Sequence, residues 1–459
     1  MSSWKKYKLG ELLELVIDHR GKTPKKLGFD DFHSNGYPVL SAKHVKTSGL
    51  VNLDVMRFAN QEMYEKWMKI PTKKGDIVLT SEAPLGELFY IDGSTQYLLG
   101  QRVFGLRTKS SLINPMYLFA WLSSPEGQSA LQARATGSTV QGIKQSELLN
   151  IELSIPNLIE QEKVAEILFN LNKKIQLNTQ INQTLEQIAQ TIFKSWFIDF
   201  DPVHAKAEAL ANGQTLEQAT QAAMAVISGK NTQELHRLQT ANPEQYQQLW
   251  EIAEAFPRGV DEEGVPRGWE MTVVKSVCEK IQNGGTPKRS NKEYWNNGNI
   301  PWLSSGEVCN NNILISSKEF ITQFGLENSS TKLIEANSTL VALYASPTAG
   351  KCSFCVFKAT TNQAVCALVP KEIYKYFNFY YLQTKEEYYS NQAVGSAQQN
   401  ISKGIVEDTP ILKPDSTILG YFNLIVVELM NKQISNLKES DYLKNIRDVL
   451  LPKLLSGEV

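Results

Sequence analysis

The first residues suited to chemistry form a short basic loop that occurs once in each half of the chain. The loop runs from Arg20 to Lys26, and its Lys25 and Lys26 recur 263 residues later as Lys288 and Arg289. Positive charge kept at both places suits contact with phosphate oxygens, which are the same whatever the sequence of a nucleic acid. A solvated turn is the alternative interpretation. The candidates in the two loops are Arg20, Lys22, Thr23, Lys25, Lys26, Thr286, Lys288 and Arg289.

Side chains that differ between the two halves are candidates for reading a base. Lys43 and His44 follow an apolar, strand-like run, and the equivalent place in the second half carries Gly306 and Glu307. Different donors and acceptors on a shared scaffold could distinguish bases. The alternative interpretation is neutral sequence drift on an exposed loop. Gln101 and Gln363 are the same in both halves, and a glutamine there, or Arg102 beside it, could read adenine or guanine. For Gln101 and Gln363 the alternative is a buried side-chain amide that holds a backbone turn. The candidates for base contact are Lys43, His44, Ser81, Glu82, Gln101, Arg102, Ser304, Ser305, Glu307, Tyr344, Ser346 and Gln363.

Two polar, glycine-bearing loops, 137–144 and 395–403, each lead toward a long helix. Their backbone amides and a lysine in each could hold phosphate. A plain connector is the alternative. The candidates here are Ser138, Gln141, Lys144, Ser396, Gln398, Gln399 and Lys403.

Catalytic chemistry is not expected from this chain alone. Both Asn-Pro pairs lack the following Pro-Phe of an amino-methyltransferase loop, and neither Glu-x-Lys nor a Gly-x-x-x-x-Gly-Lys-Ser/Thr phosphate loop occurs. Cys352 and Cys355 have the spacing of a zinc ligand pair, but no second close pair accompanies them and they lie in an apolar run. Core cysteines are therefore favoured. We expect no catalytic residue, no metal site and no cofactor.

Two long helices must position these loops. From Glu160 to Phe197 apolar residues fall three and four apart, the pattern of a helix packed against another helix. The pattern recurs 258 residues later, and its polar interruptions recur with it. Parallel pairing would set Lys174 against Lys432, so antiparallel pairing with a central polar cluster is expected. The predicted coiled-coil core is Ile167, Leu171, Lys174, Asn178, Leu185, Ile188, Leu429, Lys432, Asn436, Leu443 and Ile446.

Bulk properties narrow the class of protein. At 459 residues the chain is too long for one ordinary core. Its net charge of −1 disfavours a free-standing DNA-binding protein. No apolar run approaches the length of a membrane span, and five cysteines that all follow residue 270 make no disulfide framework. A cytoplasmic protein without a membrane partner is expected.

The constant offsets predict a duplicated α+β chain. Residues 1–156 and 267–414 read as two similar globular domains, 157–198 and 415–459 as the two long helices, and 199–266 as a helical, acidic insert. The helices would form an antiparallel coiled coil with pseudo-two-fold symmetry between the domains.

Taken together, these motifs resemble the specificity subunits of type I restriction–modification systems. The resemblance covers essentially the whole chain. It rests on Gly-x-Thr-Pro at 21–24 and 284–287, on Gly-Ser at 137–138 and 395–396 with an isoleucine after each, on the run 193–202 and on the end 450–457. Each motif alone is weak, but their order occurs twice.

The resemblance implies two target-recognition domains, each reading one half of a split DNA sequence. It also implies that two methyltransferase subunits dock on the coiled coil, and it allows two ATP-dependent nuclease/translocase subunits. The assembled complex would be a DNA adenine methyltransferase and ATP-dependent endonuclease, with this chain as a non-catalytic subunit. The rivals are a recognition subunit of another DNA-defence or modification assembly and a coiled-coil adaptor without nucleic acid.

Overall fold

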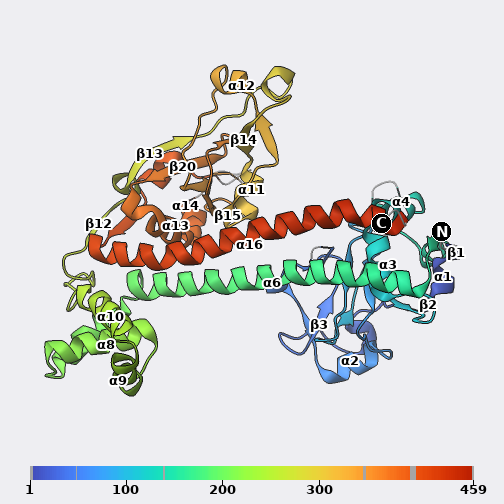
Figure 1. The fold of residues 1–459 in the computed structure, drawn as a ribbon, viewed down its shortest axis with the longest axis horizontal. Helices are drawn as coiled ribbons and strands as arrows, with labels where there is room; N and C mark the ends of the chain where they lie inside the picture. Colours follow the sequence, from blue (N-terminus) through green and yellow to red (C-terminus); the bar gives the residue numbers. More distant parts are fainter. Residues whose placement is uncertain (1–3, 48, 138–139, 345–347, 393–399, 457–459) are drawn as a thin grey trace. The chain divides into compact units, whose positions relative to one another are not determined.

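The computed structural model describes residues 4–47, 49–137, 140–344, 348–392 and 400–456. The chain forms two compact units, Met1–Leu177 with Ser440–Val459, and Asn178–Glu439 (Figure 1). Two long helices, α6 (Leu158–Phe197) and α16 (Ser416–Ser456), each contribute residues to both units. No helix in the described ranges is long and apolar enough to cross a membrane.

The first unit is built on two small sheets. One has the order β2-β10-β7-β8 and the other the order β6-β3-β9. A short antiparallel pair, β1 with β11, brings the start of the domain beside its end. The strands are β1 (Lys5–Lys8), β2 (Leu13–Asp18), β3 (Tyr37–Leu40), β6 (Phe58–Ala59), β7 (Ile77–Thr80), β8 (Leu88–Tyr90), β9 (Leu98–Leu99), β10 (Val103–Thr108) and β11 (Glu152–Ile155), with β4 (Val45–Lys46) paired to β5 (Gly49–Leu50). The helices are α1 (Leu9–Leu12), α2 (Gln61–Trp67), α3 (Pro115–Ser123), α4 (Pro125–Ala133) and α5 (Gln145–Leu149).

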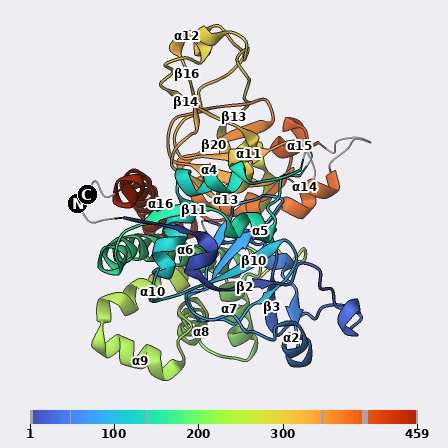
Figure 2. The same cartoon turned by 90° about the vertical axis from the view of Figure 1, so that its right-hand side faces the viewer.

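The second unit repeats this topology, as the constant offsets predict, with one more strand, β15, at the edge of its larger sheet. Its sheets have the orders β13-β20-β17-β18-β15 and β16-β14-β19, and β12 pairs with β21. The strands are β12 (Glu270–Val273), β13 (Cys278–Asn283), β14 (Ile300–Leu303), β15 (Ile313–Leu314), β16 (Glu319–Ile321), β17 (Ser338–Ala342), β18 (Cys352–Cys355), β19 (Thr360–Thr361), β20 (Val365–Pro370) and β21 (Pro410–Lys413). The helices are α11 (Ser305–Asn310), α12 (Gln323–Glu327), α13 (Lys375–Gln383), α14 (Glu386–Gln392) and α15 (Lys403–Glu407). In both views α12, β14 and β16 lie at one end of this domain and α13 lies toward the other (Figures 1 and 2).

Each unit has a core that the long helices help to build. In the first unit, Val164, Leu168 and Leu454 join the buried face of α3 in one apolar cluster. In the second, Phe193 of α6 packs against Phe377 of α13 and Phe422 of α16, with ring centroids 5.5 and 5.8 Å apart. Burying such large side chains is a main source of stability. The long helices are therefore integral parts of both cores.

Helices α6 and α16 pair in antiparallel orientation, as predicted. This holds for the segments of the two helices within the first unit and for those within the second unit. Asn178 and Asn182 contact Asn436 and Gln433 in the second unit, so the numbers rise along one helix and fall along the other. In the first unit, Arg447 bonds Asn172.

Some positions of the predicted coiled-coil core are buried or half-buried, and others are exposed. Asn178 and Asn436 are buried, and Leu171, Leu185, Leu429, Leu443 and Ile446 are half-buried. Lys174 and Lys432 are exposed, as are Ile167 at 41% and Ile188 at 42%. The buried positions come one residue later, at Leu168, Ala189 and Gln433. The sequence pattern favoured the largest apolar side chains, whereas close helix approach favours alanine and amides that can bond across the interface.

A central polar cluster does exist around the two asparagines. Asn178 Nδ2 donates to Glu439 Oε2 at 2.8 Å and to the Asn436 carbonyl at 3.4 Å. Asn436 Nδ2 donates to Asn182 Oδ1 at 2.9 Å. The partners in these three contacts are amides, a backbone carbonyl and a carboxylate.

Replacing Asn178 by Leu should destabilise the second unit by about 1–3 kcal/mol, because buried hydrogen bonds to Glu439 and to a carbonyl are lost. Without these contacts, a leucine there would be expected to raise stability, as it does at seam asparagines of simple coiled coils. Chemical denaturation measures the change, with Gln187→Leu on the exposed face of α6 as the matched control. A more stable Asn178→Leu variant would contradict a structural role for these bonds.

The insert forms four helices, α7 (Asp201–Ala211), α8 (Leu216–Ser228), α9 (Thr232–Ala241) and α10 (Pro243–Ala255). Lys206 of α7 is buried, and its Nζ donates to the carbonyls of Glu254 at 3.0 Å and Phe256 at 2.8 Å. Burial, helped by nearby Arg258, lowers the pKa of Lys206 to about 8. The lysine therefore ties the end of α10 to α7.

Candidate nucleic-acid interface

The basic loop of each domain is held by an equivalent glutamine. In the first domain (residues 4–156), Gln101 Nε2 donates to the Lys22 carbonyl at 3.1 Å. In the second domain (residues 267–414), Thr286 Oγ1 donates to Gln363 Oε1 at 2.6 Å. Both glutamines are exposed. They hold the turn, as one interpretation of the sequence expected, but their side chains are exposed and not buried.

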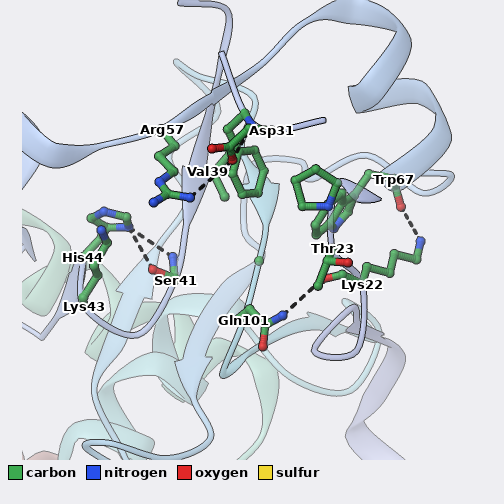
Figure 3. Close-up of a pocket in the computed structure, with 13 residues that line it drawn as sticks. Lys22, Thr23, Asp31, Val39, Ser41, Lys43, His44, Arg57, Trp67 and Gln101 are labelled. Carbon is green, nitrogen blue, oxygen red and sulfur yellow. Dashed lines mark hydrogen bonds and ion pairs between the residues drawn. The ribbon is translucent and has the colours of Figure 1, made fainter. Parts of the chain in front are cut away.

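A cavity of about 330 Å³ opens beside this loop in the first domain (Figure 3). Five predicted contact residues line it, namely Lys22, Thr23, Lys43, His44 and Gln101. The structure therefore gathers residues from the basic loop, from the end of β3 and from the turn before β10 at one place.

Sequence reasoning missed other residues that line the cavity. Arg57 and Asp31 contribute charge, and Phe32 and Trp67 contribute an aromatic wall with ring centroids 5.8 Å apart. The repeat contained a signal for Arg57, because it lies next to the phenylalanine that both halves share at 58 and 320. A complete comparison of the two halves would have shown that the residues preceding this phenylalanine differ.

Several basic side chains of the loop are engaged within the domain. Arg20 binds both carboxylate oxygens of Asp18, at 2.9 and 2.8 Å, and lies 4.0 Å over the Phe104 ring. Lys22 Nζ donates to the Trp67 carbonyl at 2.6 Å, and burial, together with Lys69, lowers its pKa. Lys26 Nζ donates to the Gly21 carbonyl at 2.8 Å. Lys25 and Lys43 are exposed at the surface of the same region.

Two predicted base contacts are buried, which argues against their direct use. His44 is 2% exposed and Ser81 is 1% exposed. The backbone N–H of Ser41 donates to His44 Nδ1 at 3.2 Å, so this ring closes the turn after β3. Burial, together with Lys43, lowers the pKa of His44 and keeps the ring neutral near pH 7. Sequence position placed both residues at strand ends but gave no sign of their depth.

Residues 140–144, the described end of the glycine-bearing loop of the first domain, lie beside Ser81 and Glu82. The Ile143 N–H donates to the Ser81 carbonyl at 2.9 Å, and Glu82 pairs with Gly142 in an antiparallel bridge. Glu82 also binds Arg102 at 3.1 Å. Gln141 and Lys144 are exposed beside this junction. Two regions of candidates that are separate in sequence are thus one surface.

The second domain places its candidates differently. Ser304 and Glu307 cap α11, with the Glu307 N–H donating to Ser304 Oγ at 3.3 Å and the Ser304 N–H donating to Glu307 Oε2 at 3.0 Å. Such a capping box occupies the carboxylate that was predicted to read a base. Lys403 binds Glu407 at 2.9 Å. Lys288 and Tyr344 are exposed, and Ser305 is half-buried. The candidates outside the described residues are Ser138, Ser346, Ser396, Gln398 and Gln399.

Cys352 and Cys355 lie in the core. Cys352 and Cys355 are 8% and 1% exposed on β18, and burial raises the pKa of Cys355 to about 12. In the described part of the chain, no three His, Cys, Asp or Glu residues are placed to hold a metal ion. These thiols pack as small apolar groups.

Comparison with known proteins agrees with this architecture. Residues 1–187 and 266–438 match the family model described as "Type I restriction modification DNA specificity domain". The chain is 33% identical to the Type I restriction enzyme HindI specificity subunit of Haemophilus influenzae, over the full length of both chains. It is 26% identical to the MjaIX specificity subunit of Methanocaldococcus jannaschii, covering 84% of this chain and 78% of the relative. The crystal structure of a type I restriction–modification S subunit from M. genitalium is 15% identical, with a TM-score of 0.55 over 99% of this chain and 96% of that one.

Two similar α+β domains, each packed with parts of the two paired long helices, define the architecture of this chain. With matches on this scale, the chain belongs to the specificity subunits of type I restriction–modification systems. The family and the fold class predicted from sequence are both confirmed.

Proposed function

We propose that the two domains each read one half of a bipartite DNA target, and that this chain supplies no catalytic group. The observation that carries this proposal is the repetition of one sheet topology with an equivalent basic loop held by an equivalent glutamine. Similar readers on one chain suit two half-sites on one duplex. Their side chains differ at the loop, so the two half-sites should differ in sequence.

Partners would bring the chemistry and much of the DNA affinity. A net charge of −1 gives the isolated chain little long-range attraction for phosphate. Two methyltransferase subunits docked on α6 and α16 would supply both a basic surface and the methyl transfer. ATP-dependent nuclease subunits would join the same assembly.

Methylome sequencing of cells that express this chain with its methyltransferase subunit tests the proposal. We expect methylated adenines in a motif of two unlike half-sites separated by a fixed non-specific spacer. The same cells with the methyltransferase subunit alone are the control. A contiguous motif, or methylation that does not depend on this chain, would contradict bipartite reading.

Binding of labelled duplexes by the assembled complex distinguishes the rivals. A coiled-coil adaptor would show no preference between the methylated motif and a scrambled duplex. A recognition subunit of another assembly would bind its motif yet leave no methyl group there.

A further inference from the structure

The two domains share a strand register that makes their side chains comparable one by one. In the first domain β3 pairs with β6, so that Pro38 lies opposite Phe58. In the second domain β14 pairs with β16, and Pro301 lies opposite Phe320. These matching pairs fix the equivalence of the neighbouring positions.

The next position along this register reverses its charge between the domains. The Val39 N–H donates to the Arg57 carbonyl at 2.9 Å, which places Arg57 opposite Val39. In the second domain Trp302 lies opposite Glu319. Arg57 and Glu319 therefore occupy the same place on the shared scaffold.

A reversal of charge at one place does not suit a shared phosphate contact. Phosphate is identical in both half-sites, and a residue that binds it in both domains keeps a positive charge, as Lys25 and Lys288 do. Base edges, in contrast, differ between half-sites and require different donors and acceptors. The charge reversal therefore argues against a phosphate contact common to both domains at this position, and it suits a base contact made by Arg57 in the first domain.

The second domain closes this place with its own side chains. Arg289 binds Glu319 at 2.6 Å, and its guanidinium lies 3.9 Å from the Trp295 ring centroid and 4.6 Å from that of Trp302. In the first domain the smaller Val39 stands where Trp302 is. The cavity of Figure 3 lies at this place, with Arg57 in its lining.

Arg57 is held loosely enough to change partner. Its guanidinium has one ion pair, with Asp31 Oδ1 at 3.5 Å, and lies 5.8 Å from the Phe32 ring centroid. The two charged side chains are 59% and 73% exposed. An exposed pair at this distance contributes little, so exchange for a better acceptor is easy. Asp31 and Phe32 nevertheless keep the guanidinium in the lining of the cavity, and Figure 3 shows Arg57 directed toward Asp31.

We propose that Arg57 reads a guanine in the half-site of the first domain. Its fork of N–H donors matches the O6 and N7 acceptors that guanine presents in the major groove, and arginine to guanine is the commonest specific contact of this kind. The inference rests on the proposed function and adds the residue and the base. Glu319, bound by Arg289, cannot play the same part in the second domain.

The test compares Arg57→Gln and Arg57→Lys with the unchanged chain, each assembled with its methyltransferase subunit. Binding is measured to duplexes that carry each base pair in turn at every position of the first half-site. For Arg57→Gln we expect discrimination at one guanine to fall by about 10- to 100-fold, in line with one bidentate contact. Discrimination across the second half-site should stay the same, which also shows that the complex is folded.

Arg57→Lys separates base reading from phosphate binding. Lysine keeps the charge but loses the planar fork, so it should relax the same guanine position. Full rescue by lysine, or a loss equal for all sequences with a smaller salt dependence, would identify a phosphate contact and overturn the proposal. Lys66→Gln on α2 is the control for loss of an exposed charge in the same domain.

The methylome of Arg57→Gln cells gives an independent result. The motif should become degenerate at one guanine of one half-site. An unchanged motif would overturn the role of Arg57 but leave bipartite reading intact. Failure of the unchanged chain to produce a bipartite motif would instead overturn the proposed function itself.

Discussion

Removal of residues 450–459 is expected to unfold the first domain while the second domain keeps its structure. Leu451, Leu454 and Leu455 of α16 are 7%, 6% and 5% exposed, and they belong to the same apolar cluster as Leu9 and Trp121. Burying each leucine contributes about 1.5–3 kcal/mol, so the three together contribute about 5–9 kcal/mol. This is comparable to the whole stability of an ordinary domain, about 5–15 kcal/mol.

Hydrogen exchange measured peptide by peptide checks this expectation, because it reports the two domains separately. Peptides from 4–156 should exchange rapidly in the truncated chain, and peptides from 267–414 should remain protected. Removal of residues 457–459 alone is the control and should change neither domain. Protection retained throughout 4–156 after the longer truncation would show that the end of the chain does not complete this core.

The duplication was predictable because a constant offset between two copies survives in the residues themselves. Pro38 and Pro301 or Phe58 and Phe320 are local matches, and pairing partners follow once the copies are aligned. Helix ends were equally accessible. Pro115 after Asn114 marks the start of α3, where the Asn114 side chain accepts from the N–H groups of Met116 and Tyr117.

The burial of individual side chains, and the residues that they contact, were harder to predict from the sequence. On α6, for example, Ala189 is fully buried, whereas Ile188 beside it is 42% exposed. Which neighbour faces inward depends on the side chains that approach from α13 and α16, and these lie about 190 to 240 residues away in sequence. A period near 3.5 residues fixes a stripe on a helix only to within about one position.

The candidate interface shows the same limit. Gln101 and Gln363 were recognised because they are conserved between the halves of the chain, and their contacts proved equivalent. The cavity was not predicted, because the residues that line it, from Lys22 to Gln101, are brought together only by the tertiary fold. His44 was misplaced for a related reason, since a polar residue after a strand is usually exposed and this one bonds back to its own turn.

Replacing Asp76 by Ala is the second change with a large expected effect. Asp76 is 1% exposed and binds Arg107 through two hydrogen bonds, from Nε at 2.9 Å and from Nη2 at 2.8 Å. It also accepts the Lys73 N–H at 2.9 Å and so fixes the turn before β7. Arg107 lies on β10, and the hydrogen bonds that its guanidinium donates to Asp76 raise the pKa of Arg107 further. Removing the carboxylate leaves a largely buried guanidinium without its counter-ion.

Breaking a buried pair from one side costs about 3–5 kcal/mol, whereas replacing both partners by apolar groups is often nearly neutral. We therefore expect Asp76→Ala to lower the free energy of unfolding of the first unit by that amount, and Asp76→Leu with Arg107→Met to recover most of it. Glu62→Ala removes an exposed pair with Lys66 on α2 and should change stability by less than about 1 kcal/mol. Denaturant unfolding of the three variants gives the values. Equal effects of Asp76→Ala and Glu62→Ala would mean that the pair of Asp76 and Arg107 is solvated in the native state. The strand ends around the cavity would then be positioned by apolar packing alone.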